Sequence, residues 1–349
     1  MRKIIALTDY KNHFGSKWKS NPYRSGYDQS LLKNYFNDNN YNIEFISLRN
    51  IDLKAKDWKN QLVIYTSSEE IGFNYKSFIE DIALELERLG AILLPSFDFL
   101  RANNNKVFME ILRNRVLGKE LSGNHSRYYG AIEELYADIK ENKIEYPIVI
   151  KKAEGAMSRG VFLAKNEKEL IKYAKIISRT PHLKAEIKEK IRKQKHNGYR
   201  PESSYQAKFI TQTFIPNLTN DWKVLIYGNH YYILKRGIKA NDFRASGSHY
   251  NYKAGSKSEF PLHKLDEVKQ MFESLNTPHL SLDYAYDGER GYVHEIQGVF
   301  FGTSTLEFCP DYYTHNGKEW VVEKQQLDQE GEYVYSIVHY LKQHSELIK

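Results

Sequence analysis

Short apolar runs alternate with helically spaced apolar positions through the first hundred residues. Four runs predict strands: Lys3–Leu7, Ile43–Leu48, Leu62–Tyr65 and Ala91–Leu94. Leu31–Phe36 indicates a first helix. A second helix is predicted where apolar side chains recur at i, i+3, i+4 and i+7, namely Tyr75, Phe78, Ile79, Ile82, Leu86 and Leu89, with Gly90 as its stop. Alternation of strands and helices predicts an α/β layer with a mostly parallel sheet.

The pattern changes after this layer. Helices are expected over Asn105–Val116, Glu167–Ile177 and, at the end, Glu332–Lys342. From residue 206 the chain is rich in strand patterns. The expected strands are Tyr146–Lys151, Val161–Ala164, Phe209–Phe214, Lys223–Tyr227, Tyr231–Lys235, Leu280–Tyr286 and Tyr292–Gln297. The overall class is therefore α/β shading into α+β.

The length of 349 residues suggests two or three domains, and we expect them at 1–100, 101–205 and 206–349. Hydrophobic residues make up 41% and charged residues 27%, which is ordinary globular usage. No apolar run approaches the roughly 20 residues of a membrane span, and the start does not resemble a signal peptide. We therefore expect a cytoplasmic protein. The single cysteine, Cys309, excludes an internal disulfide and a multi-cysteine zinc site.

The net charge of +7 is unevenly distributed. Between Lys184 and Arg200 the Lys and Arg residues outnumber Glu186 and Glu189 by five. This segment predicts a solvated helix face and a loop, inserted into the fold. A nucleic-acid-binding segment is the alternative. The rest of the chain is nearly neutral, so the overall charge says little about function.

A hairpin with acidic strands carries the strongest chemical signal. Two apolar-flanked strands are joined by an Asp- and Gly-rich turn, which puts Asp283 opposite Glu295, with Glu295 and Gln297 on one face. Opposed carboxylates repel, and a bound Mg²⁺ would remove the repulsion. The alternative is a surface hairpin with scattered acids. Since strand faces alternate, His294 is expected on the other face, in a structural role.

Two further segments suggest anion binding. Lys151 ends a strand and is followed by a loop that contains Gly155, Ser158 and Gly160, so it offers a cation and free N–H groups for phosphates. The spacing is not that of a Walker A loop.

A second hairpin should place Arg236 opposite Asp221. The pair could be an ordinary cross-strand ion pair. Alternatively, Lys223, Arg236 and Arg244 form a row of cations that faces phosphates or a substrate carboxylate.

Taken in order, these motifs resemble those of the ATP-grasp superfamily of ligases. The resemblance covers about Ala91 to Phe308. In the first half, a lysine that opens a helix is matched by Asn105-Lys106, a Pro-x-x-x-Lys strand by Pro147–Lys151, and a glycine-rich loop by Gly155–Gly160. In the second half, a Gln-x-Phe-Ile segment is matched by Gln212–Ile215, an acid–base pair by Asp221–Lys223, and a Phe-Arg pair by Phe243-Arg244. The closing acid set is matched by Asp283, Glu295 and Gln297. Two positions depart from the family: Gln297 replaces Asn, and Lys223 replaces Arg.

The resemblance implies a parallel α/β domain followed by a two-part ATP-grasp fold with antiparallel sheets. It implies that ATP binds between the two parts. Backbone groups of a hinge segment, Gln212, Thr213, Phe214 and Ile215, would read the adenine, and Asp221 would be a further cofactor-binding residue. Lys106 and Lys151 would hold phosphates under a lid formed by Gly155, Ser158 and Gly160. Asp283, Glu295 and Gln297 would bind two Mg²⁺ ions.

The implied activity is ligation of a carboxylate to an amine through an acyl phosphate, with Lys223, Arg236 and Arg244 as catalytic residues. A kinase of the same fold is an alternative, and a non-catalytic nucleic-acid-binding module is a weaker one. Homodimers are common among such proteins, so a homodimer is compatible with the resemblance. The substrates stay open.

Overall fold

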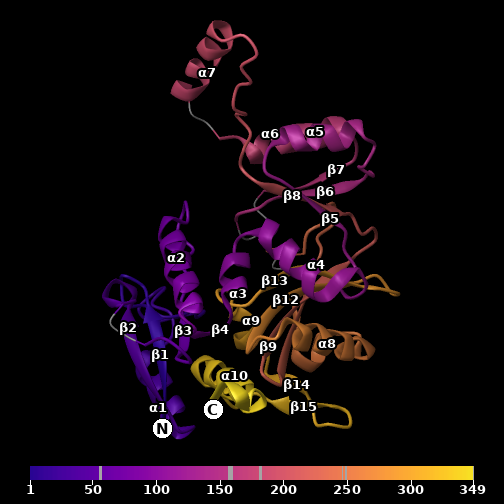
Figure 1. Cartoon of the computed structure of the whole chain (residues 1–349). Helices are drawn as coiled ribbons and strands as arrows, with labels where there is room; N and C mark the ends of the chain where they lie inside the picture. The colour runs from indigo at the N-terminus through magenta and orange to yellow at the C-terminus, as the bar shows by residue number, and fades with distance from the viewer. Residues whose placement is uncertain (55–56, 156–159, 181–182, 246, 248–249, 349) are drawn as a thin grey trace.

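The computed structural model describes residues 1–349 except 55–56, 156–159, 181–182, 246, 248–249 and 349. The described chain forms three sheets, one parallel and two antiparallel, with helices on their faces (Figure 1). The predicted mixed α/β class is confirmed. No helix in the described ranges has the length and apolar content needed to cross a bilayer.

The first sheet is a parallel layer built from the N-terminal apolar runs. Its order is β2-β1-β3-β4, and all neighbouring strands run parallel. The bounds are β1 Arg2–Thr8, α1 Gln29–Asp38, β2 Tyr41–Ser47, β3 Leu62–Tyr65, α2 Asn74–Arg88 and β4 Ile92–Leu94. Each predicted element here is confirmed, because strong apolar patterns and clear turn residues specify both the type and the position of the elements.

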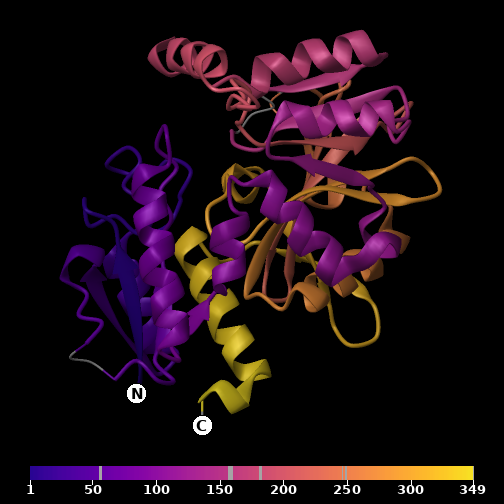
Figure 2. The ribbon, with the colours of Figure 1, turned by 45° about the horizontal axis from the view of Figure 1, so that its top comes forward.

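The last helix of the chain completes this first layer. Helix α10, Gln329–Gln343, packs against α1 and lies between the N-terminal layer and the large sheet (Figure 2). Its apolar face shares one core with residues of the first layer, among them Ile337 and Leu341 with Leu32 and Phe36. The N-terminal layer therefore depends on a segment that is more than 200 residues away along the chain.

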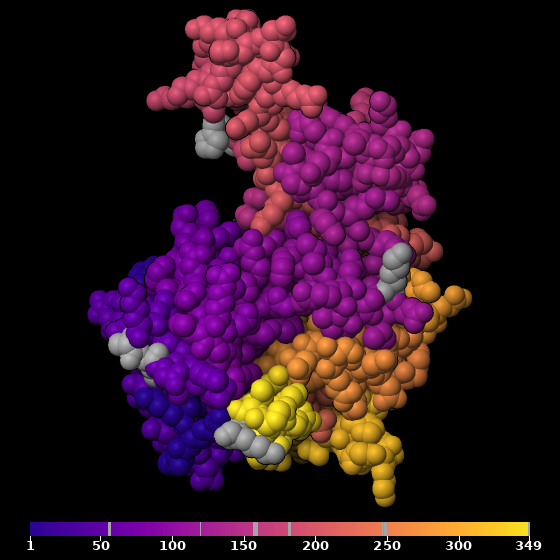
Figure 3. Space-filling view, in the orientation of Figure 1, coloured from indigo at the N-terminus to yellow at the C-terminus, as the bar shows by residue number. Residues whose placement is uncertain are grey.

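The central sheet is small and entirely antiparallel, with the order β5-β8-β6-β7. Its elements are β5 Ser126–Tyr129, α5 Ile132–Lys140, β6 Ile148–Lys152, β7 Val161–Ala164, α6 Glu167–Ser178, α7 Leu183–Lys195 and β8 Phe209–Thr213. Helices α5 and α6 pack on it through one apolar cluster. In contrast, α7 buries no residue and projects from the body of the molecule (Figures 1 and 3).

The largest sheet has seven strands in the order β13-β12-β9-β10-β14-β15, with β11 pairing with β10. The bounds are α3 Phe97–Ala102, α4 Lys106–Ser122, β9 Asn220–Tyr227, β10 His230–Gly237, β11 Lys253–Ala254, α8 Leu265–Leu275, β12 His279–Tyr286, β13 Gly291–Gln297, α9 Ser304–Phe308, β14 Asp311–His315 and β15 Trp320–Lys324. Helices α4 and α8 share an apolar core with one face of this sheet.

Two elements pack with a sheet on the other side of an expected domain boundary. Strand β8 belongs to the central sheet, and α4 packs on the large sheet. The division into 1–100, 101–205 and 206–349 stays a prediction.

Candidate active site

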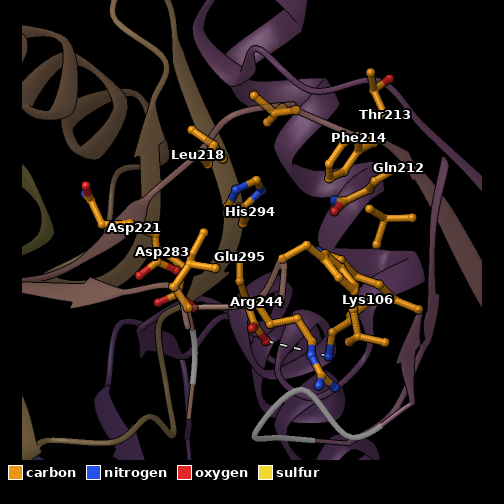
Figure 4. Close-up of a pocket in the computed structure, with 18 of the residues that line it drawn as sticks. Lys106, Gln212, Thr213, Phe214, Leu218, Asp221, Arg244, Asp283, His294 and Glu295 are labelled. Carbon is orange, nitrogen blue, oxygen red and sulfur yellow. Dashed lines mark ion pairs between the residues drawn. The ribbon is translucent and has the colours of Figure 1, made fainter. Parts of the chain in front are cut away.

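A cleft lies between the central sheet and the large sheet (Figure 4). Strands β6, β7 and β8 supply one wall, and β9, β12 and β13 supply the opposite wall. The lining residues are Lys106, Val149, Lys151, Gly155, Val161, Gln212, Thr213, Phe214, Ile215, Leu218, Asn220, Asp221, Ile238, Phe243, Arg244, Ala245, Asp283, His294 and Glu295.

Two lysines from different elements enter the cleft. Lys106 is the first residue of α4, and its Nζ lies 3.0 Å from the Gly155 carbonyl oxygen and 3.8 Å from Glu295 Oε1. Lys151 lies on β6 two residues after Val149, so both side chains face the cleft. Burial lowers the pKa of Lys151 to about 8, although the carboxylates of Glu110 and Glu295 oppose this shift. The two cations can therefore neutralise an anion at this place.

The glycine-rich loop begins beside Lys106, whose Nζ contacts the Gly155 carbonyl oxygen. The Gly155 N–H donates to Asn104 Oδ1 at 2.8 Å, so the loop is tied to the start of α4. Gly160 has φ +76°, and a Cβ there would lie 3.1 Å from Lys152 Cβ, which favours glycine. Ser158 lies outside the described residues.

The Gln-x-Phe-Ile segment forms a continuous edge of the cleft. Gln212 and Thr213 end β8, and all four residues from Gln212 to Ile215 are among the lining residues. The ring of Phe214 meets that of Phe243 edge to face at 6.4 Å between centroids. Phe243 and Arg244 thus lie near the predicted hinge, as the order of the motifs implied.

The opposed carboxylates are confirmed on the other wall. Asp283 on β12 pairs with Glu295 on β13 in the strand register. Arg236 Nη2 lies 3.0 Å from Asp283 Oδ2, and Lys223 Nζ lies 3.5 Å from Oδ1. Burial alone would raise the pKa of Asp283, but the charges of Arg236 and Lys223 outweigh it and hold the pKa well below the usual range. Asp283 is therefore ionised at neutral pH.

The predicted pairing of Asp221 with Arg236 is also confirmed. The two residues oppose each other across β9 and β10, and the guanidinium forms two hydrogen bonds of 2.7 Å to the carboxylate. Arg236 thus links Asp221 to Asp283 beneath the cleft.

Of the predicted row of cations, Arg244 alone is among the described residues that line the cleft, where it pairs with Asp242 at 2.9 Å. A catalytic role for Lys223, Arg236 or Arg244 stays a prediction.

The acid wall has the oxygen donors that Mg²⁺ prefers. Asp283 Oδ1 is buried and has no hydrogen-bond partner among the described residues, so it can accept a further ligand. Within those residues, no group of three or more His, Cys, Asp or Glu side chains could hold a metal ion. Gln297 opposes Ser281 on the same hairpin and is not in the described lining. Asp283 and Glu295 fit a metal that shares its shell with phosphate oxygens, and a role for Gln297 stays a prediction.

The prediction that His294 faces away from Glu295 is wrong. Asp283 pairs with Glu295 and Tyr284 pairs with Val293, so His294 is the extra residue of a β-bulge. A bulge interrupts the alternation of faces, and both His294 and Glu295 line the cleft (Figure 4). Burial, followed by the charge of Lys151, lowers the pKa of His294 to about 3, so this imidazole is neutral.

Sequence reasoning missed the apolar lining and the support beneath it. Val149 and Val161 could have been found from their alternation with strand residues already assigned. Glu110 and Arg113 are fully buried within α4. No local pattern distinguishes them from charged residues on an exposed helix face.

Comparisons with known proteins give matches in structure only. No protein-family model matches the sequence, and no curated protein matches it. A RimK-domain ATP-grasp protein from Sphaerobacter thermophilus DSM 20745 superposes with a TM-score of 0.51 at 13% identity, over 97% of this chain and 99% of that chain. D-cycloserine synthetase DcsG gives 0.55 at 9%, over 97% and 99%.

A RiPP-associated ATP-grasp ligase from Chryseobacterium gregarium, solved with ADP and with leader and core peptide, gives a TM-score of 0.52 at 12% identity, over 99% of this chain and 97% of that chain. These matches span almost the whole chain. The chain therefore has the ATP-grasp fold.

Proposed function

We propose that this protein is an ATP- and Mg²⁺-dependent ligase that joins a carboxylate to an amine. The observation that carries the proposal is the cleft between two antiparallel sheets, where Lys106 and Lys151 on one side face Asp283 and Glu295 on the other. A site that has cations for phosphates and carboxylates for a metal suits a metal-bound nucleoside triphosphate better than a simple anion. One structural neighbour was solved with ADP, which supports the same assignment.

ATP would lie with its base along Gln212–Ile215 and its phosphates between the two lysines. Lys106 already contacts the carbonyl of Gly155, so a phosphate held by this lysine would lie at the glycine-rich loop. Closure of that loop would keep water from the reacting groups.

Asp283 and Glu295 would hold Mg²⁺, with Gln297 as a further oxygen donor. When bound, the ion neutralises charge on the phosphates that react. The side chains also offset these charges: Arg236 and Lys223 pair with Asp283, and Lys106 lies near Glu295.

The reaction would follow from this arrangement in two steps. A carboxylate oxygen of the substrate attacks the γ-phosphorus, ADP leaves, and an acyl phosphate forms. The amine nitrogen then attacks the acyl carbon, phosphate leaves, and the amine loses its proton to give an amide. The side chains supply position and charge, and none of them needs to form a covalent bond.

The test is a screen of amino acids, peptides and sugar acids for phosphate release from ATP that requires both a carboxylate and an amine. ADP, free phosphate and an amide product are the expected result. A phosphorylated product would instead assign a kinase. Failure to bind ATP in a calorimetric titration, with or without Mg²⁺, would contradict the nucleotide site itself.

A further inference from the structure

A buried carboxylate lies directly behind the predicted hinge. Glu110 on α4 has 0% of its surface exposed, and hydrogen bonds from three side chains converge on it. Gln212 Nε2 donates to Oε1 at 2.6 Å. Arg113 and Ser126 both donate to Oε2. The carboxylate can only accept, so it determines which end of each partner faces it.

Glu110 thereby fixes the amide of Gln212 in one orientation. An amide can normally turn by 180° and exchange its donor and acceptor ends. Here the reversed orientation would set the amide oxygen against a carboxylate oxygen, which repels it. With the nitrogen held by Glu110, Oε1 is the remaining end of the group, and no described residue donates a hydrogen bond to it.

The free acceptor lies at the cleft. Gln212 is one of the lining residues, and in Figure 4 its side chain points toward the middle of the cavity. A base that lies along Gln212–Ile215 would meet a hydrogen-bond acceptor at this point. Adenine carries an amino group at position 6 that can donate to it. Guanine and hypoxanthine carry a carbonyl oxygen there, which would be repelled.

We propose that Gln212 is a specificity-determining residue that selects adenine over 6-oxopurines, and that Glu110 is the positioning residue that makes it do so. The proposal rests on the nucleotide site proposed above. It adds a side-chain criterion for the base, separate from any backbone contact of the hinge. A site built to pair a donor rejects an analogue that presents an acceptor, because the buried acceptor is left unpaired.

The experiment compares the dissociation constants of ATP and inosine triphosphate by calorimetry. Inosine triphosphate differs from ATP at position 6 and in the proton on the neighbouring ring nitrogen. We expect the wild-type chain to bind ATP at least about tenfold more tightly. In Glu110→Gln, residue 110 can accept a hydrogen bond from Gln212 or donate one to it, so both orientations of the Gln212 amide are allowed. The ratio of the dissociation constant of inosine triphosphate to that of ATP should then fall toward one.

Two further variants keep the test decisive. Gln212→Met removes the acceptor together with the donor to Glu110 Oε1, and it leaves the hydrogen bonds from Arg113 and Ser126 to Oε2 in place. It should also bring the ratio toward one if Glu110→Gln does not fold. Ser126→Ala removes another hydrogen bond of the same carboxylate, yet leaves Gln212 in place, so its ratio should match that of the wild type.

Three outcomes would overturn the inference: equal binding of both nucleotides by the wild type, a wild-type ratio in Gln212→Met, or an equal loss of discrimination in Ser126→Ala. A wild-type chain that binds neither nucleotide would overturn the nucleotide site, and this inference with it.

Discussion

Lys151 combines a position in the cleft with a proton that is easily lost. Burial reduces the stability of its charged form and lowers its pKa to about 8. Below this pH the ammonium is charged and can bind phosphate, and above it the free amine is neutral. A bound phosphate would favour the charged form and raise the pKa again. Nucleotide binding should therefore be coupled to uptake of a proton in the alkaline range.

This coupling predicts a specific pH dependence. Between pH 7 and pH 9 the affinity of the wild type for ATP should fall about tenfold, because only about a tenth of Lys151 is protonated at pH 9. Lys151→Met keeps the length of the side chain but cannot titrate. It should bind more weakly at pH 7 and show a much flatter profile, measured by calorimetry in buffers of different ionisation enthalpy. If the ATP affinity of Lys151→Met depended on pH as steeply as that of the wild type, a group other than Lys151 would be responsible for the pH dependence.

At the scale of elements, the local sequence pattern correctly predicted strands and hairpins, but it did not predict the irregularities within them. The turn after Tyr227 set the register that brings Arg236 opposite Asp221. The same logic correctly paired Asp283 with Glu295. It was wrong for His294, because a bulge arises from how two strands match in length, and one strand's sequence does not encode the mismatch.

Elements with weak local patterns were missed for a related reason. Strands β5, β14 and β15 are short, and their buried tyrosines, Tyr129, Tyr312 and Tyr313, lie in apolar cores that other elements complete. Glu110 and Arg113 lie on a helix whose position was predicted. Their burial depends on β13 and β8 packing over them, which only the folded chain reveals.

Helix α7 is the opposite case, an element that packing does not require. Its apolar residues remain exposed, with Leu183 at 74% and Ile187 at 59%. Its acids form ion pairs, Glu186 with Arg179 and Glu189 with Arg192. The expected solvated helix is confirmed here. We attribute no stability of the body to it.

A short linker can test this statement. Replacement of residues 184–198 by a Gly-Ser linker should shift the melting temperature of the body by less than about 2 °C, since exposed positions contribute little to stability. The matched control is the wild type under identical conditions in differential scanning calorimetry. A drop of many degrees would mean that α7 packs against the body in solution.

At the scale of the whole molecule, the two ends of the chain form one layer. Ile337 of α10 is fully buried in the same core as Ile4, Leu32 and Phe36. The polar side of the helix also contacts the large sheet, where Glu332 accepts a hydrogen bond from the Tyr232 hydroxyl at 2.6 Å. The pattern predicted the helix, but amphipathicity alone does not say which sheet an amphipathic helix covers.

Ile337→Ala should therefore destabilise the first layer from the far end of the chain. We expect a loss of about 2–5 kcal/mol in the free energy of unfolding, the usual cost of such a truncation in a core. Hydrogen exchange should show the increased opening in β1 and α1. Lys324→Ala, at the exposed end of β15, is the control and should have no such effect. Unchanged protection of β1 in Ile337→Ala would contradict the shared core.

The place of α10 has a consequence for how the protein is made. The first sheet leaves the ribosome complete in its strands, but the helix that covers one of its faces is translated about 235 residues later, counting from β4 to α10. At a synthesis rate of about 5–20 residues per second, this face of the sheet would remain uncovered for roughly 12–47 s. During that interval Leu32, Phe36 and their neighbours are open to solvent, and nascent chains should depend on a chaperone or on slow synthesis until the last helix arrives.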